Sequence, residues 1–308
     1  MASGKSKKKK DRQKTQAAAA ENLQPQASSS VWPRLVKHPW APVIPLLALV
    51  VLFYLPAFKA GYVWTDRDMI AGSADLAGWQ NLGEDWSEAS GLTMDDGYMP
   101  LSDFFFRLQN ALWDFSPSLT HGMSLALHAL NAVLLWRLLL ALGIPGAFLG
   151  GLFFALHPLN AEAAVWLQGQ PYLLALMFSL MALHCFVRLL KEDSWMWVML
   201  TLALSAAALL SHRLAVCLPF IALVIHWWQA REWNLKVIVS IGGVILMLCG
   251  YILLSIQLIS QAAEGAGLSA GSRMALAGRT FFWYVRRFAW PENLTIVYPR
   301  WNLPALSG

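Results

Sequence analysis

Residues 119–142 read LTHGMSLALHALNAVLLWRLLLAL, an apolar run that is long enough to cross a lipid bilayer as one helix. Such a crossing needs about 20 mostly apolar residues. The residues that follow, Gly143-Ile-Pro-Gly146, are typical of a turn, and a further apolar run begins at Ala147. This stretch therefore predicts two consecutive membrane helices.

The composition of the whole chain agrees with a membrane protein. Of the 308 residues, 57% are hydrophobic and 13% are charged, whereas soluble domains carry about 25% charged residues. This excludes an ordinary water-soluble globule. We predict an all-α polytopic membrane protein with about seven transmembrane helices, within residues 41–58, 119–142, 147 onward, 172–187, 195–210, 214–228 and 237–259.

The positive charge of the chain belongs to its first residues. Residues 1–30 hold seven Lys or Arg against Asp11 and Glu21, and the rest of the chain has a net charge of zero. We expect residues 1–38 to be a disordered basic tail that is retained in the cytoplasm, and 39–259 to be the membrane domain. Arg188, Lys191, Arg231 and Lys236 in the short inner loops agree with this orientation. A membrane surface explains the tail better than nucleic acid does, so no nucleic-acid partner is expected.

Two outer segments have opposite charge. Residues 61–118 form a long first outer loop with ten acidic residues against Arg67 and Arg107, and its amphipathic stretch 101–113 predicts a helix in the membrane interface. Residues 260–308 are expected to be a basic interfacial segment on the same outer side.

The three cysteines lie in apolar runs without CxxC spacing, so we expect buried thiols and neither a disulfide framework nor a metal site.

Several polar residues whose placement in a membrane costs free energy lie on the predicted outer side. Glu162 lies about 24 Å along the third helix, which we expect to kink at Pro158. His212 and Arg213 close the fifth helix on the same side. A site that handles an anionic lipid headgroup in the outer leaflet would have this arrangement. His128 and Asn131 share one helix face, and we expect them to hydrogen-bond to other helices.

Six short motifs then carry a resemblance to a family. Leu156-His-Pro-Leu-Asn-Ala-Glu-Ala-Ala-Val165 resembles the His-Pro-x-His-x-Glu-Ala-Val motif of the transmembrane and tetratricopeptide-repeat O-mannosyltransferases, which belong to the C-type superfamily of membrane glycosyltransferases. Similar matches, in the family's order, are Val63-Trp-Thr-Asp-Arg67, Tyr98-Met-Pro-Leu-Ser102, Leu127-His-Ala-Leu-Asn-Ala132, Gly169-Gln-Pro-Tyr-Leu-Leu174 and Leu210-Ser-His-Arg-Leu-Ala215.

Several charged positions of the family have changed type. Its acidic pair is Thr65-Asp66 here, and Met99 stands in place of an Arg. Gln170 and Tyr172 replace an Arg and an Asp, and His212-Arg213 replaces a Lys-Glu pair. The tetratricopeptide repeats are absent, so the chain is a short relative or an incomplete one.

The resemblance implies a glycosyltransferase that uses a polyprenyl-phosphate sugar, and it places the catalytic base on Asp66. Asp68 would support Asp66 or share a divalent metal with it. The alternative, which is stronger for Asp68 than for Asp66, is that both are solvated loop acids. No metal-binding cluster is expected, and the cofactor stays open. The substrate-binding residues we expect are His157, Asn160, Glu162, His212, Arg213, Arg273 and Arg279. For His157, Asn160 and Glu162, the alternative is a local polar cluster that satisfies the backbone freed by Pro158.

The expected activity is transfer of a sugar to a protein or glycan hydroxyl, with inversion at the sugar carbon, on the outer face of a bacterial inner membrane. The expected partners are membrane lipid, the lipid-linked donor and the acceptor. Two alternatives remain. The altered charged positions also fit a non-catalytic scaffold or partner subunit, and a lipid-sugar flippase or transporter would need more polar residues at the bilayer midplane than this chain has.

Overall fold

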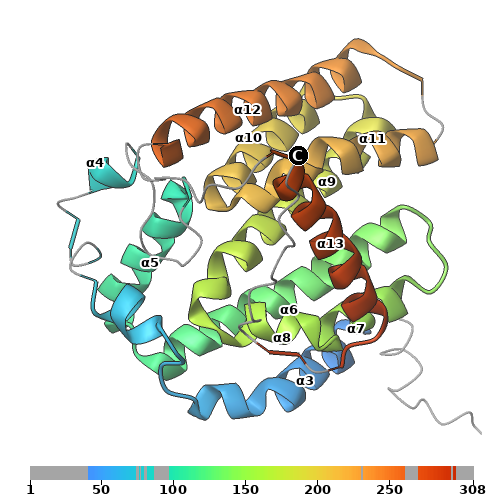
Figure 1. Ribbon diagram of the computed structural model, residues 1–308. Helices are drawn as coiled ribbons and strands as arrows, with labels where there is room; N and C mark the ends of the chain where they lie inside the picture. Colours follow the sequence, from blue (N-terminus) through green and yellow to red (C-terminus); the bar gives the residue numbers. More distant parts are fainter. Residues whose placement is uncertain are drawn as a thin grey trace, which may run out of the picture. The chain divides into compact units, whose positions relative to one another are not determined.

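The computed structural model describes residues 41–73, 76, 78–79, 82–86, 97–229, 232–260, 270–292 and 294–295. The chain divides into two units, Met1–Pro42 and Val43–Gly308. The second unit is built of helices and short connections (Figure 1): α3 (Val43–Tyr54), η1 (Leu55–Lys59), η2 (Arg67–Ala71), α4 (Leu82–Asp85), α5 (Pro100–Trp113), α6 (Pro117–Ala141), α7 (Ala147–Leu156), α8 (Leu159–Val165), η4 (Leu167–Gly169), α9 (Gln170–Glu192), α10 (Trp195–Ser211), η5 (Arg213–Cys217), α11 (Leu218–Trp228), α12 (Leu235–Ser260) and α13 (Ala270–Ala289).

Helices occupy every segment in which the sequence predicts a membrane crossing. By length and apolar composition, three helical segments could each cross a membrane: Pro117–Ala141, Leu167–Glu192 and Leu235–Gln257. The pair α7 and α8, bent by 64° at its break, would make a fourth. The helices α3, α10 and α11 are apolar but shorter. The protein is therefore an all-helical, multi-pass membrane protein, and three or four crossings are supported among the described residues.

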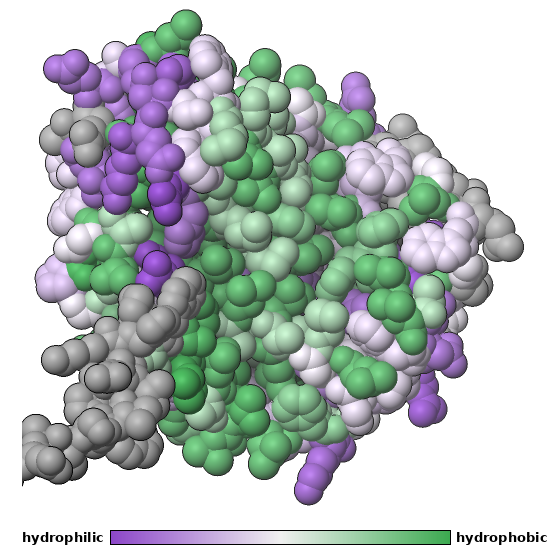
Figure 2. Space-filling model, turned by 180° about the vertical axis from the view of Figure 1, so that it is seen from behind, coloured by the Kyte–Doolittle hydropathy of each residue, from purple (hydrophilic) through white to green (hydrophobic). Residues whose placement is uncertain are grey.

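Much of the described surface is apolar. Leu149, Met199, Phe220 and Leu246, on four different helices, are 64–73% exposed. Figure 2 shows apolar side chains across the middle of one face, with hydrophilic side chains toward its margins. In water such a continuous surface would be costly, whereas lipid chains solvate it without penalty.

Two of the four groups of buried apolar side chains among the described residues join most of the helices. Leu183, Phe186, Val198 and Val244 belong to the larger group, which joins α9, α10 and α12. The smaller group joins α3, α6, α7 and α8 and includes Leu46 and Ala132. At the contact between α6 and α7, a Cβ atom on Gly151 would lie 2.6 Å from the Trp136 Cβ atom, so only glycine permits this close approach.

Polar side chains also join the helices. The His128 Nε2 atom on α6 donates to the Ala155 carbonyl oxygen on α7 at 3.0 Å. The Asn131 Nδ2 atom donates to the Leu173 carbonyl oxygen on α9 at 2.8 Å. These bonds confirm the helix-to-helix role predicted for both residues.

The connections between helices gather at two ends of the second unit. At one end, Lys191 donates to the Ala141 carbonyl oxygen at 3.1 Å and Lys236 pairs with Asp193 at 2.9 Å. At the other end, the Gln168 Nε2 atom donates to the Thr65 hydroxyl oxygen at 2.7 Å. The connections predicted to lie inside thus meet one another, and so do segments predicted to lie outside.

The kink predicted at Pro158 is confirmed, because His157 adopts an extended conformation and α7 and α8 are bent by 64° at the break. Two expectations need correction. Cys217 and Cys249 are exposed rather than buried. The helix predicted at 101–113 exists as α5, but its buried face holds the polar side chains of Asp103, Arg107 and Gln109 beside Phe106. The expected tail 1–38 lies outside the described residues.

Candidate functional site

Asp66 lies in a tight turn between η1 and η2. The backbone N–H of Asp66 donates to the Val63 carbonyl oxygen at 3.1 Å, and the Val63 N–H donates back to Asp66 Oδ2 at 3.1 Å. Trp64, inside the turn, has a φ of +53°, which is costly for a bulky side chain. Asp66 is fully buried, and among the described residues its Oδ1 atom has no hydrogen-bond partner.

Burial raises the pKa of Asp66 above the ordinary value of an aspartate, because the charged form loses its hydration. The N–H groups of Val63, Leu167 and Gln168 and the charge of His121 oppose this shift without cancelling it. A carboxylate with a raised pKa is a better proton acceptor than a solvated one, and it therefore fits a general base.

The Asp66 turn packs against the segment that follows α8. The rings of Trp64 and Trp166 stack with centroids 5.6 Å apart, and Thr65 accepts the Gln168 hydrogen bond described above. Gly169 makes this contact region compact, because a Cβ atom there would lie 2.7 Å from the Ala163 carbonyl oxygen. The turn that carries Asp66 and the helix that carries Glu162 thus adjoin the same short segment.

Asp68 differs from Asp66 in its surroundings. It lies in the first turn of η2 and is exposed. Among the described residues, no group of three or more His, Cys, Asp or Glu side chains is arranged to hold a metal ion. The described geometry therefore provides no metal site of this kind for the two carboxylates.

His157 and Asn160 cap the break between α7 and α8. The Leu159 N–H donates to His157 Nδ1 at 3.3 Å, and His157 Nε2 donates to the Phe288 carbonyl oxygen on α13 at 3.1 Å. The Asn160 side chain donates to the Phe154 carbonyl oxygen at 2.7 Å. Both side chains thus satisfy backbone groups around the Pro158 break, as the structural alternative for this motif requires.

Glu162 lies on α8 and lines an open cavity of about 380 Å³. The cavity lies between α8 and residues of α13, and Val63 of the Asp66 turn also lines it. Asp66 itself is behind this wall, one hydrogen bond from Val63. The structure thus brings Glu162 and the Asp66 turn to the same cavity.

His212 and Arg213 face different surroundings although they are consecutive. The His212 ring packs on the Tyr172 ring with centroids 4.2 Å apart, and its Nδ1 atom accepts the Leu214 N–H at 3.1 Å. Burial lowers the pKa of His212 to about 4, so the side chain is neutral near pH 7. Arg213 lines a second cavity of about 420 Å³ with Tyr98 and Tyr251, and its charge acts on the Tyr251 hydroxyl.

Of the two α13 arginines predicted to bind substrate, only Arg279 has a described side chain. Arg279 lies on α13 and is exposed. The backbone of Arg273 also belongs to α13, but its side chain lies outside the described residues.

Sequence reasoning missed a buried polar network next to the site. Gln109 on α5 donates to Gln170 on α9 at 2.6 Å, and Gln170 donates to the Ser124 hydroxyl on α6 at 2.9 Å. Gln170 stands where the family motif has an arginine, so that position is occupied here by a neutral side chain in a helix-to-helix network. A local pattern could not reveal it, because Gln109 and Gln170 are 61 residues apart.

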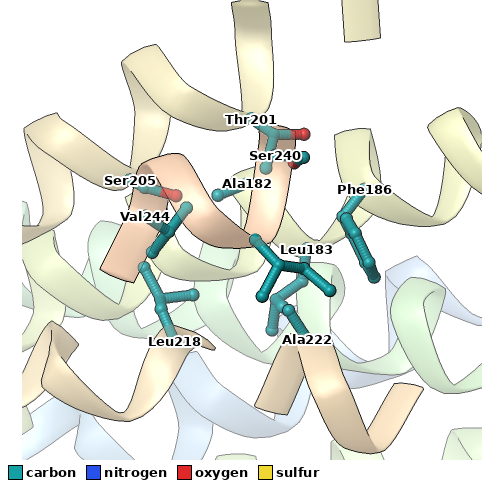
Figure 3. Close-up of a pocket in the computed structure, with 10 residues that line it drawn as sticks. Ala182, Leu183, Phe186, Thr201, Ser205, Leu218, Ala222, Ser240 and Val244 are labelled. Carbon is teal, nitrogen blue, oxygen red and sulfur yellow. The ribbon is translucent and has the colours of Figure 1, made fainter. Parts of the chain in front are cut away.

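Another opening lies within the helix core (Figure 3). It is lined by apolar side chains and the hydroxyls of Thr201, Ser205 and Ser240, and its volume is about 10 Å³. This is about the space of one water molecule. It is therefore a packing defect among α9 to α12 and not a substrate site.

Comparison with known proteins gives the family. Residues 98–255, just over half of the chain, match the model of the dolichyl-phosphate-mannose-protein mannosyltransferase family. The chain is 28% identical over 181 residues to the protein O-mannosyl-transferase Tmtc1 of Drosophila melanogaster. The aligned residues cover 55% of this chain and 21% of that protein. It is 26% identical over 220 residues to the protein O-mannosyl-transferase TMTC3 of Mus musculus, which covers 68% of this chain and 24% of that protein.

The aligned parts thus span only about a fifth to a quarter of the length of these relatives. The comparison with solved structures gave no significant match. The family model covers α5 to α11 and α12 as far as Ser255, a region that includes Glu162, His212 and Arg213. By that match, the chain belongs to the dolichyl-phosphate-mannose-protein mannosyltransferase family.

Proposed function

We propose that this protein is a membrane glycosyltransferase that moves a sugar from a polyprenyl-phosphate-linked donor to a hydroxyl of a protein or glycan acceptor. The observation that carries the proposal is the fully buried Asp66, whose turn forms part of the Glu162 cavity. The family and the names of its relatives, protein O-mannosyl-transferases, support the same reaction class.

In the proposed reaction, the acceptor oxygen attacks the anomeric carbon of the donor sugar. The bond from that carbon to the phosphate oxygen breaks, and its electron pair leaves with the polyprenyl phosphate. Asp66 accepts the proton of the acceptor hydroxyl, and the sugar carbon is inverted. Because Asp66 is behind the cavity wall, the strained turn around Trp64 has to move for the carboxylate to meet the acceptor.

Arg213 is our proposed partner of the donor phosphate. Its guanidinium matches phosphate oxygens, and the other described residues that line its cavity are uncharged, with Ser255 among aromatic and aliphatic side chains. His212 would contribute as a neutral hydrogen-bond donor. We propose that Arg273 and Arg279 contact lipid headgroups or the donor, that Asp68 supports Asp66, and that His157 and Asn160 act by shaping the break that presents Glu162.

The proposed setting follows the predicted topology. We place the basic tail 1–38 in the cytoplasm, the membrane domain at 39–259 with seven crossings, and the site with residues 260–308 on the outer face of a bacterial inner membrane. The clustering of Lys191 and Lys236 at the end opposite the Asp66 turn supports this orientation.

A non-catalytic scaffold or partner subunit is the second candidate. One observation favours it: Gln170, at a position where the family motif has an arginine, has its amide engaged by Gln109 and Ser124. A chain that kept the fold after losing catalysis could accumulate such neutral replacements.

An in vitro transfer assay separates the two candidates. The protein is reconstituted in lipid vesicles with polyprenyl-phosphate mannose, and transfer to a serine- and threonine-containing peptide and to an oligosaccharide is followed by mass spectrometry. Asp66→Asn keeps the size of the side chain and should lower the rate by about 10²–10⁴-fold. Asp114→Asn, an exposed acid of the same loop, is the matched control and should leave the rate unchanged. Equal rates for Asp66→Asn and the wild type would contradict Asp66 as the base, and no transfer by the wild type would favour the scaffold.

A further inference from the structure

The Asp66 turn is held by hydrogen bonds at both of its ends. At its start, the Gly61 carbonyl oxygen accepts from the His121 Nε2 atom on α6 at 3.1 Å. At its end, the Thr65 hydroxyl oxygen accepts from the Gln168 Nε2 atom on η4 at 2.7 Å. Gln168 is 1% exposed and His121 is fully buried, so each donor lies inside the protein, where a hydrogen bond is costly to lose. Asp66 directly follows the second of these bonds.

Of the two segments that the second bond joins, η4 is the fixed one. A Cβ atom on Gly169, next to Gln168, would lie 2.7 Å from the Ala163 carbonyl oxygen and 2.8 Å from its Cα atom, so η4 packs directly on the backbone of α8. In the turn, Trp64 has a φ of +53°, and its ring is 49% exposed although it stacks on Trp166. The turn is therefore the part that can move.

The closed turn keeps Asp66 away from water. Asp66 is fully buried behind Val63, which lines the open Glu162 cavity. A base that met water in this cavity would activate it as it activates an acceptor hydroxyl. Water would then attack the anomeric carbon, Asp66 would accept a proton from that water, and the electron pair of the broken bond would leave with the polyprenyl phosphate. The donor would be lost as free sugar and polyprenyl phosphate.

We propose that Gln168 is a positioning residue that selects the acceptor hydroxyl over water: its hydrogen bond to Thr65 holds the turn closed over Asp66 while no acceptor is bound. Movement of the turn breaks this bond and relieves the strain at Trp64, and Asp66 then meets the acceptor in the cavity. The inference rests on the proposed function, because Asp66 has to be the base. Closure of the turn by Gln168 can be measured without transfer.

The first measurement is hydrogen exchange, followed by mass spectrometry, of the full chain in lipid nanodiscs without donor or acceptor. The N–H groups of Val63 and Asp66 are the probes, because both donate within the closed turn at 3.1 Å. Thr65→Val keeps the shape of the side chain and removes its hydroxyl, and Gln168→Leu removes the donor. Each should speed exchange in peptides that span the two probes by roughly two- to tenfold, which corresponds to the loss of one hydrogen bond.

Two further variants show whether this one bond is responsible. Thr65→Ser keeps the hydroxyl and is the matched control, so it should exchange as the wild type does. The double variant Thr65→Val with Gln168→Leu should exchange no faster than the faster single variant, because both substitutions remove the same bond.

The second measurement is the ratio of hydrolysis to transfer. The protein in lipid vesicles is supplied with polyprenyl-phosphate mannose and a serine- and threonine-containing peptide, and free mannose and mannosylated peptide are quantified. The ratio should rise in Thr65→Val and Gln168→Leu by the factor measured for exchange, and it should stay at the wild-type value in Thr65→Ser. A residue that only stabilised the fold would lower both products together and leave the ratio unchanged.

Three results would overturn the inference. They are unchanged exchange in both Thr65→Val and Gln168→Leu, faster exchange with an unchanged ratio, and exchange in Thr65→Ser as fast as in Thr65→Val. If the wild type transfers mannose, each of these contradicts the inference alone. A wild type that neither transfers nor hydrolyses would contradict the proposed function, and the exchange rates would then decide whether Gln168 closes the turn.

Discussion

Asp66 combines two properties that rarely occur together in a loop acid. It is fully buried, and burial raises the pKa of its carboxyl group. From the sequence, Asp66 could be distinguished from the other acids of the first outer loop only by its place in the family motif. Its neighbour Asp68, two residues away, is exposed. The difference arises from the tight turn at Val63, which no local pattern of charges reveals.

The raised pKa of Asp66 predicts a pH dependence. A general base has to be ionised, so the rate should increase as the pH rises through the pKa of Asp66 and be lost below it. Because burial raises this pKa, the loss should occur at a higher pH than for a solvated aspartate, whose pKa is about 3.9. The measurement is kcat/KM of the reconstituted enzyme against pH. An acidic limb at or below the value of a solvated aspartate would contradict a buried base.

At the scale of elements, the break between α7 and α8 shapes the site. Pro158 predicts a kink, and the structure gives a bend of 64°. The bend angle could not be predicted from the sequence, because it depends on the carbonyl groups to which His157 and Asn160 donate hydrogen bonds. The carbonyl that accepts from His157 is on α13. The same limit applies to Gln109 and Gln170, which meet only after three helices have packed.

The close contact between Gly169 and Ala163, in the segment from α8 to α9, predicts that one added methyl group at Gly169 lowers the stability of the protein. Gly169→Ala would place a Cβ atom 2.7 Å from the Ala163 carbonyl oxygen and 2.8 Å from its Cα atom. Both are backbone atoms that cannot rotate away, so we expect a loss of about 1–3 kcal/mol in the free energy of unfolding. Thermal denaturation in detergent measures it.

Gly242→Ala is the control for that change. Gly242 lies within α12, and a Cβ atom there would meet nothing within 4 Å. This substitution should leave the melting temperature unchanged or raise it slightly, because alanine favours helix more than glycine does. Equal destabilisation by both substitutions would show that the close approach of Gly169 to Ala163 is not what limits stability.

For the whole molecule, the sequence predicts the positions of the helices better than the number of crossings. The apolar runs all correspond to helices, since lipid and helix packing both require apolar side chains. However, α3, α10 and α11 are shorter than a typical crossing, and a run of apolar residues does not distinguish a short crossing from a helix buried in the protein.

Seven crossings with the N-terminus inside predict which residues a membrane-impermeant maleimide can reach. In a background with Cys185, Cys217 and Cys249 replaced by alanine, a cysteine introduced by Gly61→Cys should be labelled from outside intact cells. Glu232→Cys, in the connection before α12, should be labelled only after the cells are opened. Both positions are exposed, so accessibility in the protein is matched. Labelling of Glu232→Cys in intact cells would contradict the topology.

The most direct test of transferase activity is the mass of envelope glycoproteins and glycans from a strain that lacks the gene. The strain is complemented with the wild type, Asp66→Asn or Asp114→Asn, each at equal membrane expression. A mass corresponding to one hexose should be lost on deletion and return with the wild type and Asp114→Asn, but not with Asp66→Asn. Full restoration by Asp66→Asn would contradict Asp66 as the base, and no change of mass on deletion would contradict the transferase itself.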